Sequence, residues 1–259
     1  MKQFNRIRRM PWEQFAVLIA LAAFAAGAQA QSVTGTILIQ RKLTHKKVTA
    51  DVSVYQRGAA VTLGKDSEED PLAYEQSRVV IYLEGPVAPE ANSPARQPVQ
   101  PIQVEQRDRR FSPDIAVVPA GSSVSFPNMD PIFHNIFSLS KPKSFDLGSY
   151  DKGQTRTVLF PKPGIVEVYC HLHPNMAATI VVTPNRFYAQ PDKSGQYRIA
   201  DVPPGTYTVV AWHRSAGFFR KQITISTGQN VTADFFIPIA ADPKEDNRAD
   251  DLARGTASK

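Results

Sequence analysis

The feature that most constrains the fold of this chain is a series of short runs rich in Val, Ile, Thr, Tyr and Phe, each ended by Pro, Gly, Asn or Asp. No long stretch places apolar residues at the spacing of a helix. Short strands at intervals, separated by turn residues, are typical of β-sandwiches, so we predict an all-β chain. The expected strands cover residues 33–40, 48–56, 78–83, 101–106, 115–118, 123–126, 133–138, 155–160, 165–170, 179–183, 196–199, 207–213, 222–226 and 231–237.

The first thirty residues have the composition of an export signal. Four cations lie within the first nine residues, an apolar run covers 15–26, and Ala28-Gln29-Ala30 has the small-x-small pattern of a cleavage site. This order predicts a signal peptide, residues 1–30, that is removed so that the mature chain begins at Gln31 in the periplasm. The alternative is an uncleaved anchor that attaches the protein to a membrane, although the apolar run is short for a bilayer.

The charge of the chain argues against nucleic acid as a partner. The full sequence has a net charge of +6 at pH 7, and without residues 1–30 the balance is 26 cations against 23 anions, or about +3. We find no basic stripe with interleaved aromatic residues. The acidic run 66–70 is expected to be a solvated loop and the stretch 86–101, rich in Pro and Ala, an irregular connection. The polar residues 240–259 are expected to form a disordered tail.

Cys170 is the single cysteine of the chain. In an exported protein, a cysteine without an intramolecular partner is either reactive or a ligand. His173 and Met176 follow it at intervals of three residues, and His134 lies at the end of another apolar run upstream. One thiolate, two imidazoles and one thioether are the ligand set of a mononuclear type 1 (blue) copper site, so we predict one copper ion per chain. A buried thiol that acts as a small apolar residue is the alternative, but it leaves the other three residues unexplained.

Strand alternation indicates how these side chains can meet. In the run 165–170, alternation points the side chain of Cys170 inward at the end of the strand. The turn that follows, stiffened by Pro174, has to bring the histidine and the methionine back toward the thiol. A second strand delivers His134 from elsewhere in the sheet.

The same residues carry a family resemblance. The loop 170–176 has the spacing C-x₂-H-x₂-M with proline after the histidine, and residues 121–128 have the pattern G-x-x-V-x-F-x-N. With the His134-Asn135 pair, these motifs resemble the cupredoxin family, and most closely its amicyanin type, from about residue 106 to residue 183. The resemblance implies a Greek-key β-sandwich that carries single electrons on copper.

The resemblance also implies roles for single residues. It makes four residues the copper ligands, namely His134, Cys170, His173 and Met176. It makes Asn135 a supporting residue that ties the two ligand-bearing segments together by hydrogen bonds. His171 departs from the family's loop, and we expect its side chain to point to solvent, where it could compete for metal or give copper a route to the site. His45 and His213 are expected to be ordinary surface or hydrogen-bonded residues.

The C-terminal part resembles a different family. The segments 192–199 and 202–209, with a tight turn at Pro204-Gly205, look like the carboxypeptidase regulatory-like (transthyretin-like) β-sandwich, a smaller immunoglobulin-like sandwich. Two segments before the copper region, 35–37 and 52–55, are similar to that family's opening strands. We infer that the copper domain is inserted into this sandwich, with two sequential domains as the alternative. The expected boundaries are 1–30 for the signal peptide, 31–76 and 184–239 for the two parts of the smaller sandwich, 77–183 for the cupredoxin domain and 240–259 for the tail.

Three functions fit these residues. The leading hypothesis is a periplasmic carrier of single electrons between redox partners, such as a c-type cytochrome, a dehydrogenase or a reductase. We do not expect an enzyme, because five histidines cannot supply a second, histidine-rich set of copper ligands and one cysteine cannot form a binuclear centre. The alternatives are a protein that binds and delivers copper, and an accessory module with no electron-transfer role.

Overall fold

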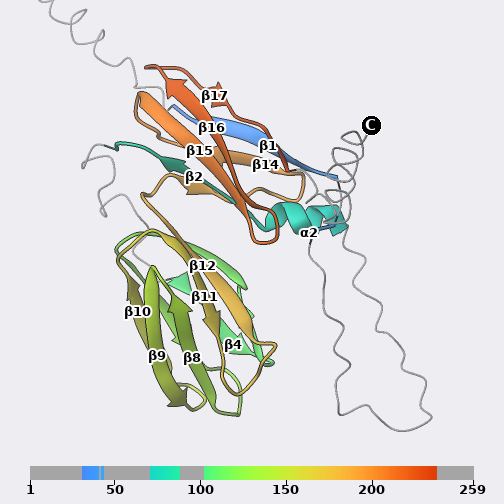
Figure 1. Ribbon diagram of the computed structural model, residues 1–259, viewed down its shortest axis with the longest axis vertical. Helices are drawn as coiled ribbons and strands as arrows, with labels where there is room; N and C mark the ends of the chain where they lie inside the picture. The colour runs from blue at the N-terminus through green and yellow to red at the C-terminus, as the bar shows by residue number, and fades with distance from the viewer. Residues whose placement is uncertain (1–30, 41, 44–70, 88–101, 238–259) are drawn as a thin grey trace, which may run out of the picture. The chain divides into compact units, whose positions relative to one another are not determined.

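The computed structural model describes residues 31–40, 42–43, 71–87 and 102–237 of the chain. Almost every element in these ranges is a strand, which confirms the predicted all-β class, and the strands build two β-sandwiches (Figure 1). Within the same ranges, no helix has the length and apolar composition needed to cross a membrane. Several predictions fall outside the described residues, namely the signal peptide 1–30, the strand 48–56, the acidic run 66–70 and the tail 240–259.

The sandwich that contains the cysteine is built from two sheets and a hairpin. Its strands are β3 (Ile102–Gln103), β4 (Glu105–Arg107), β5 (Arg110–Ser112), β6 (Ile115–Pro119), β7 (Ser122–Pro127), β8 (His134–Ser140), β9 (Lys143–Tyr150), β10 (Thr155–Phe160), β11 (Gly164–Tyr169) and β12 (Ala177–Thr183). One sheet has the order β6-β12-β11-β8-β9, a second has the order β10-β7-β3, and β4 pairs with β5. Figure 1 shows β8, β11 and β12 side by side in the larger sheet. This neighbourhood brings together the two segments that contain the predicted ligands.

The core of this sandwich follows from strand alternation. Side chains on the inner faces of both sheets are apolar and buried, among them Phe126, Ile136 and Phe160. Cys170 and Met176 belong to the same buried cluster, so the thiol and the thioether lie at the edge of a packed apolar core. Such packing holds side chains in fixed positions.

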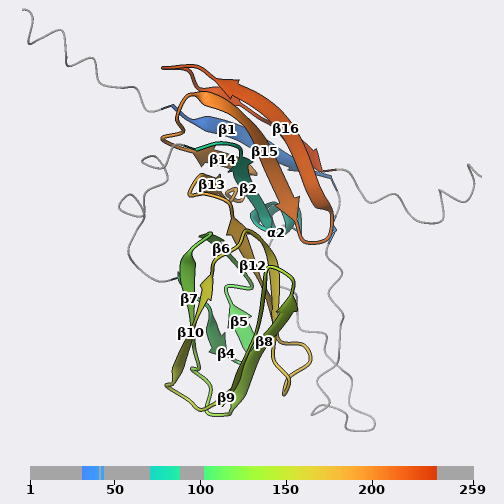
Figure 2. The ribbon, with the colours of Figure 1, turned by 60° about the vertical axis from the view of Figure 1, so that its left-hand side comes forward.

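The second sandwich combines strands from both ends of the described chain. They are β1 (Val33–Ile39), β2 (Val79–Glu84), β13 (Tyr188–Ala189), β14 (Gln196–Ile199), β15 (Gly205–His213), β16 (Gly217–Ile225), β17 (Val231–Thr232) and β18 (Phe235–Ile237). In one sheet β1 pairs with β14, β17 and β18, and the other has the order β13-β2-β15-β16 (Figure 2). Strands that precede the cysteine-containing sandwich in sequence therefore share sheets with strands that follow it.

The pairing of β2 differs from the boundary expected at residue 77. We expected this strand in the cupredoxin domain, but it runs antiparallel to β15 along its whole length and also pairs with β13. Its first five residues, 79–83, are all buried. A strand with both faces covered has no alternation that would indicate which sheet it joins, so the sequence alone did not assign it. The other domain boundaries stay predictions.

Four elements were not predicted, namely helix α2 and the strands β5, β9 and β13. Helix α2 (Pro71–Ser77) has only seven residues, too few to show a helical period. Strand β9 alternates between half-buried and exposed side chains and contains Gly148, so its sequence lacks the apolar run that marks the other strands. It extends the larger sheet by pairing with β8.

Candidate metal centre

The loop between β11 and β12, residues 170–176, is closed by its own backbone. The two strands pair up to Tyr169 and Ala177, which fixes both ends of the loop. The Cys170 N–H donates to the Met176 carbonyl at 3.2 Å, and the Met176 N–H donates to the His173 carbonyl at 2.9 Å. These bonds fold the loop into a compact turn, so the spacing of three residues returns the chain to the cysteine.

His134 reaches the same place from β8. This strand lies next to β11, where Phe137 pairs with Tyr169, and His134 is its first residue. On its other side His134 pairs with Tyr150 of β9. His134 is fully buried.

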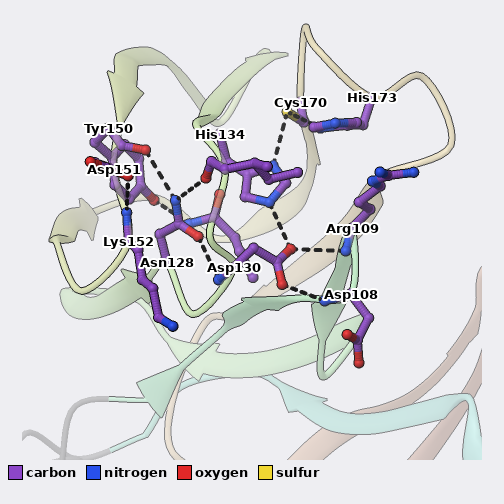
Figure 3. A network of polar contacts seen from close by, with 12 residues as sticks. Asp108, Arg109, Asn128, Asp130, His134, Tyr150, Asp151, Lys152, Cys170 and His173 are labelled. Carbon is purple, nitrogen blue, oxygen red and sulfur yellow. Dashed lines mark hydrogen bonds and ion pairs between the residues drawn. The ribbon is translucent and has the colours of Figure 1, made fainter.

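Three predicted ligand atoms converge (Figure 3). The Cys170 Sγ atom lies 3.8 Å from His134 Nδ1 and 3.7 Å from His173 Nδ1, and all three atoms lie within 4.8 Å of one another. Bonds of about 2.0–2.3 Å to one ion, as in zinc sites, place a nitrogen and a sulfur of a trigonal plane about 3.8 Å apart. The donor set and its spacing therefore fit a single soft or borderline metal ion.

The ligand candidates differ in their access to solvent. His134, Cys170 and Met176 are buried, with 0%, 4% and 1% of their surfaces exposed, whereas His173 is half-buried. Met176 lies in the same apolar cluster as Cys170, at the end of the loop. Of the four predicted ligands, His173 alone offers an edge to the surroundings. Exposed apolar side chains adjoin the two histidines in sequence, namely Phe133 before His134 and Leu172 before His173.

A carboxylate that the sequence did not reveal lies behind His134. The Nε2 atom of His134 is 2.8 Å from Asp130 Oδ2, and the Asp130 side chain is 8% exposed (Figure 3). Asp130 also accepts hydrogen bonds from the backbone N–H groups of Asp108 and Arg109, in the turn between β4 and β5. The only signal in the sequence was a cluster of turn-forming residues, Asn128 to Asp130, shortly before the histidine. Turn residues are common, so this signal did not single out Asp130.

The electrostatics of the site favour neutral imidazole and ionised carboxylate. Desolvation lowers the pKa of His173, and the neighbouring His134 and Arg109 lower it further. Burial alone would raise the pKa of Asp130, but the Arg109 N–H, His134 and the Asp108 N–H together hold that pKa below its usual value. A neutral imidazole keeps a lone pair for a metal ion.

The expected role of Asn135 needs a correction. Asn135 is buried, but its Nδ2 atom donates to Asp146 Oδ1 at 2.7 Å and so ties β8 to β9 rather than to the ligand loop. Its Oδ1 atom has no partner among the described residues. The contact with the loop is indirect, because Asp146 Oδ2 lies 3.7 Å from His171 Nε2. The sequence placed Asn135 beside the site, but a motif does not specify which strand an amide faces.

His171 remains outside the cluster. Its side chain is 56% exposed and its ring stacks on Phe137, with 3.7 Å between ring centroids and an angle of 3°. The ring therefore lies on the outer surface of β8, which agrees with the expectation that His171 points away from the ligands.

His213 is hydrogen-bonded, as expected, but buried. Its Nε2 atom is 3.0 Å from Glu75 Oε2, and its Nδ1 atom accepts the Ser215 N–H. Both ring nitrogens are thus occupied by protein groups. His45 lies outside the described residues.

Comparison with protein families gives a match in the C-terminal part of the chain. The sequence model of polysaccharide lyase family 4, domain II, a fibronectin type III-like module, matches residues 179–233. This range overlaps the segment that resembles carboxypeptidase regulatory-like sandwiches. The match agrees with a β-sandwich there, but it does not support that particular family. A comparison with curated protein sequences finds no significant match.

Comparison with solved structures finds copper proteins of the cupredoxin class. Amicyanin from Paracoccus versutus is 21% identical over 34% of this chain and 86% of its own, with a TM-score of 0.31. A purple cupredoxin from Nitrosopumilus maritimus is 24% identical over 31% of this chain and 98% of its own, with a TM-score of 0.29. A copper-containing nitrite reductase from Thermus scotoductus is 26% identical over 32% of this chain and 22% of its own, with a TM-score of 0.31. The case for the site therefore depends on its geometry.

Proposed function

We propose that this protein is an exported carrier of single electrons with one type 1 copper ion, bound by His134, Cys170, His173 and Met176. The observation that carries the proposal is the convergence of a buried, unpaired thiol with two imidazole nitrogens at the spacing of trigonal metal ligands. Copper bound by such a set alternates between Cu(II) and Cu(I) and so accepts or donates one electron.

The surrounding protein supports this role by holding the donor atoms still. The thiol and the thioether are fixed in a packed core, and the backbone bonds of the ligand loop close it independently of any ion. A rigid set of donors changes little between two oxidation states, which keeps the reorganisation that accompanies electron transfer small. Met176 would supply a weak thioether ligand to the ion.

The half-buried His173 is the proposed route for electrons. It is the ligand candidate with an edge toward solvent, and Leu172 and Pro174 beside it are exposed. An apolar surface with few charges can meet a redox partner without a large desolvation cost. We propose a c-type cytochrome, a dehydrogenase or a reductase in the periplasm as that partner, and a membrane attachment only if the leader is retained.

We propose no bond chemistry for the site. Among the described residues, His134, Cys170 and His173 are the one group of His, Cys, Asp and Glu whose donor atoms cluster tightly enough to hold a metal ion. With five histidines in the whole chain, a second copper centre of the kind used by multicopper oxidases would lack ligands.

Copper delivery is the second candidate function. It is favoured by His171, whose exposed ring adjoins Cys170 in sequence and lies near Asp146. An exposed imidazole and a carboxylate next to a buried thiol could receive copper from, or pass it to, another protein. A delivery protein should release its ion readily, whereas a carrier of electrons should hold it in both oxidation states.

An optical titration tests the proposal. The mature chain is loaded with Cu(II), reduced with ascorbate and reoxidised in air, alongside Cys170→Ala and the matched control His171→Ala. We expect an intense thiolate-to-copper band that bleaches and returns, is absent in Cys170→Ala and persists in His171→Ala. Weak absorption in the wild type, together with rapid loss of copper to a mild chelator, would rule out the carrier and favour delivery.

A further inference from the structure

The buried carboxylate of Asp130 gives His134 an environment that His173 lacks. His134 uses Nδ1 to face Cys170 and Nε2 to face Asp130, at 2.8 Å (Figure 3). His173 also faces Cys170 with Nδ1, but no carboxylate bonds to its ring among the described contacts. The two imidazoles are therefore inequivalent.

The contact with Asp130 determines which ring nitrogen of His134 is free. A carboxylate only accepts, so the Nε2 atom opposite it carries the proton and Nδ1 keeps its lone pair. His213 provides a comparison within the same chain, because its Nε2 atom also faces a carboxylate, that of Glu75. There, however, Nδ1 accepts a backbone N–H, so the same arrangement leaves no nitrogen for a metal ion.

Asp130 is itself held in place from several sides. Its oxygens accept the Asp108 N–H at 2.7 Å and the Arg109 N–H at 2.9 Å, and its own N–H donates to Asn128 Oδ1 at 3.0 Å. Both turn residues have positive φ angles, 55° for Asp108 and 54° for Arg109, so their N–H groups point toward the carboxylate. With the imidazole, three donors face its two oxygens, which is the environment of an ionised carboxylate.

A bond to a turn could also be purely structural. Asp192 shows such a role in the second sandwich, where its Oδ1 atom accepts the Ser194 N–H and the Gln196 N–H. Asp192 caps a turn and touches no ligand candidate. Asp130 makes the same kind of bonds and in addition contacts His134. A comparison of the same substitution at the two aspartates therefore distinguishes an effect on a turn from an effect on the candidate metal site.

We propose that Asp130 is a positioning residue that fixes the Nδ1 atom of His134 toward the metal ion and favours Cu(II) over Cu(I) through its negative charge. This inference rests on the proposed function. A carboxylate behind a ligating histidine orients the ring and raises its basicity, and loss of such a partner changes metal affinity by about 10–100-fold. A fixed negative charge stabilises the doubly charged ion more than the singly charged one.

Asp130→Asn, in the full chain, is the direct test. Asparagine has the shape of aspartate and keeps one acceptor oxygen, but it lacks the charge. We expect the affinity for Cu(II) relative to Cu(I) to fall at least about tenfold. For the one-electron Cu(II)/Cu(I) couple, a tenfold change raises the reduction potential by about 59 mV. The matched control Asp192→Asn removes the same charge from a turn-capping aspartate that touches no ligand candidate, and it should leave the potential unchanged.

A redox titration separates the outcomes. Equal potentials in Asp130→Asn and the wild type would overturn the inference and leave the proposed function intact. A wild-type protein without a reversible thiolate-to-copper band would overturn the proposed function, and the inference with it.

A second measurement decides the matter if Asp130→Asn does not fold. In the metal-free wild-type chain, long-range proton–nitrogen NMR locates the protons on the imidazoles. We expect the proton of His134 on Nε2, exchanging with water much more slowly than the ring proton of His173. A His134 proton on Nδ1, or one that exchanges as fast as that of His173, would overturn the assignment.

Discussion

Tyr150→Phe should destabilise the cysteine-containing sandwich through one buried amide. The Tyr150 side chain is 1% exposed, and its hydroxyl accepts a hydrogen bond from Gln106 Nε2 at 2.6 Å and donates to the Phe126 carbonyl at 2.9 Å. Gln106 is fully buried, and its Oε1 atom has no hydrogen-bond partner. Removal of the hydroxyl therefore leaves the whole amide group of Gln106 buried without a partner.

The expected cost follows from this geometry. A buried donor that loses its partner costs about 1–3 kcal/mol, and the lost bond to the Phe126 carbonyl adds about 1 kcal/mol, so we expect Tyr150→Phe to lower the free energy of unfolding by about 3 kcal/mol. In a Gln106→Leu background the amide is gone, and the same substitution loses only the bond to Phe126, worth about 1 kcal/mol. The loss of the Phe126 bond is common to both backgrounds, so the two sites should couple by about 2 kcal/mol, the cost of the unpartnered amide and within the range found for residues in one network.

Urea unfolding of the four metal-free proteins, followed by circular dichroism, measures this coupling. The wild type, both single variants and the double variant complete a double-mutant cycle. If Tyr150→Phe costs the same with Gln106 and with Leu at that position, the buried amide is not the cause and the reasoning is refuted.

Three further predictions concern a close approach, a buried histidine and the thioether ligand. Gly35→Ala should lower stability by about 1–3 kcal/mol, because a Cβ atom would lie 2.7 Å from the Ala233 carbonyl carbon; an unchanged melting temperature would contradict this. Burial lowers the pKa of His213 more than Glu75 raises it, so the folded state binds fewer protons than the unfolded state, and stability should fall as the pH drops below about 6.5. His213→Gln should show a smaller loss over the same range, and an equal loss would exclude this histidine as the cause. Met176→Leu should change the stability of the metal-free chain by less than about 1.5 kcal/mol but shift the copper spectrum and potential; unchanged values of both would remove Met176 from the ligand set.

The strands of the sandwiches were predictable where one or both faces are apolar. The run 165–170 ends in an inward-facing cysteine because alternation is a local property of the backbone. Strand β9 was missed, because its half-exposed alternation resembles a loop and its pairing with β8 is a long-range contact. Strand β2 was predicted as a strand, but its sheet was not, because its buried residues are compatible with either sandwich.

The sequence by itself determined the composition of the candidate site. A lone cysteine, two histidines and a methionine at short spacing specify a soft donor set, because donor chemistry belongs to the side chain and the spacing of a loop is local. The convergence of Cys170 with His134 depends on β8 lying beside β11, which only the folded sheets decide.

The tertiary structure also decided which polar groups support the donors. Asp130 faces His134 because the turn between β4 and β5 and the segment before β8 pack together. Asn135 faces β9 because of its place in the larger sheet. The direction of a side chain toward a neighbour distant in sequence depends on long-range packing, and the identity of the residue alone does not encode it.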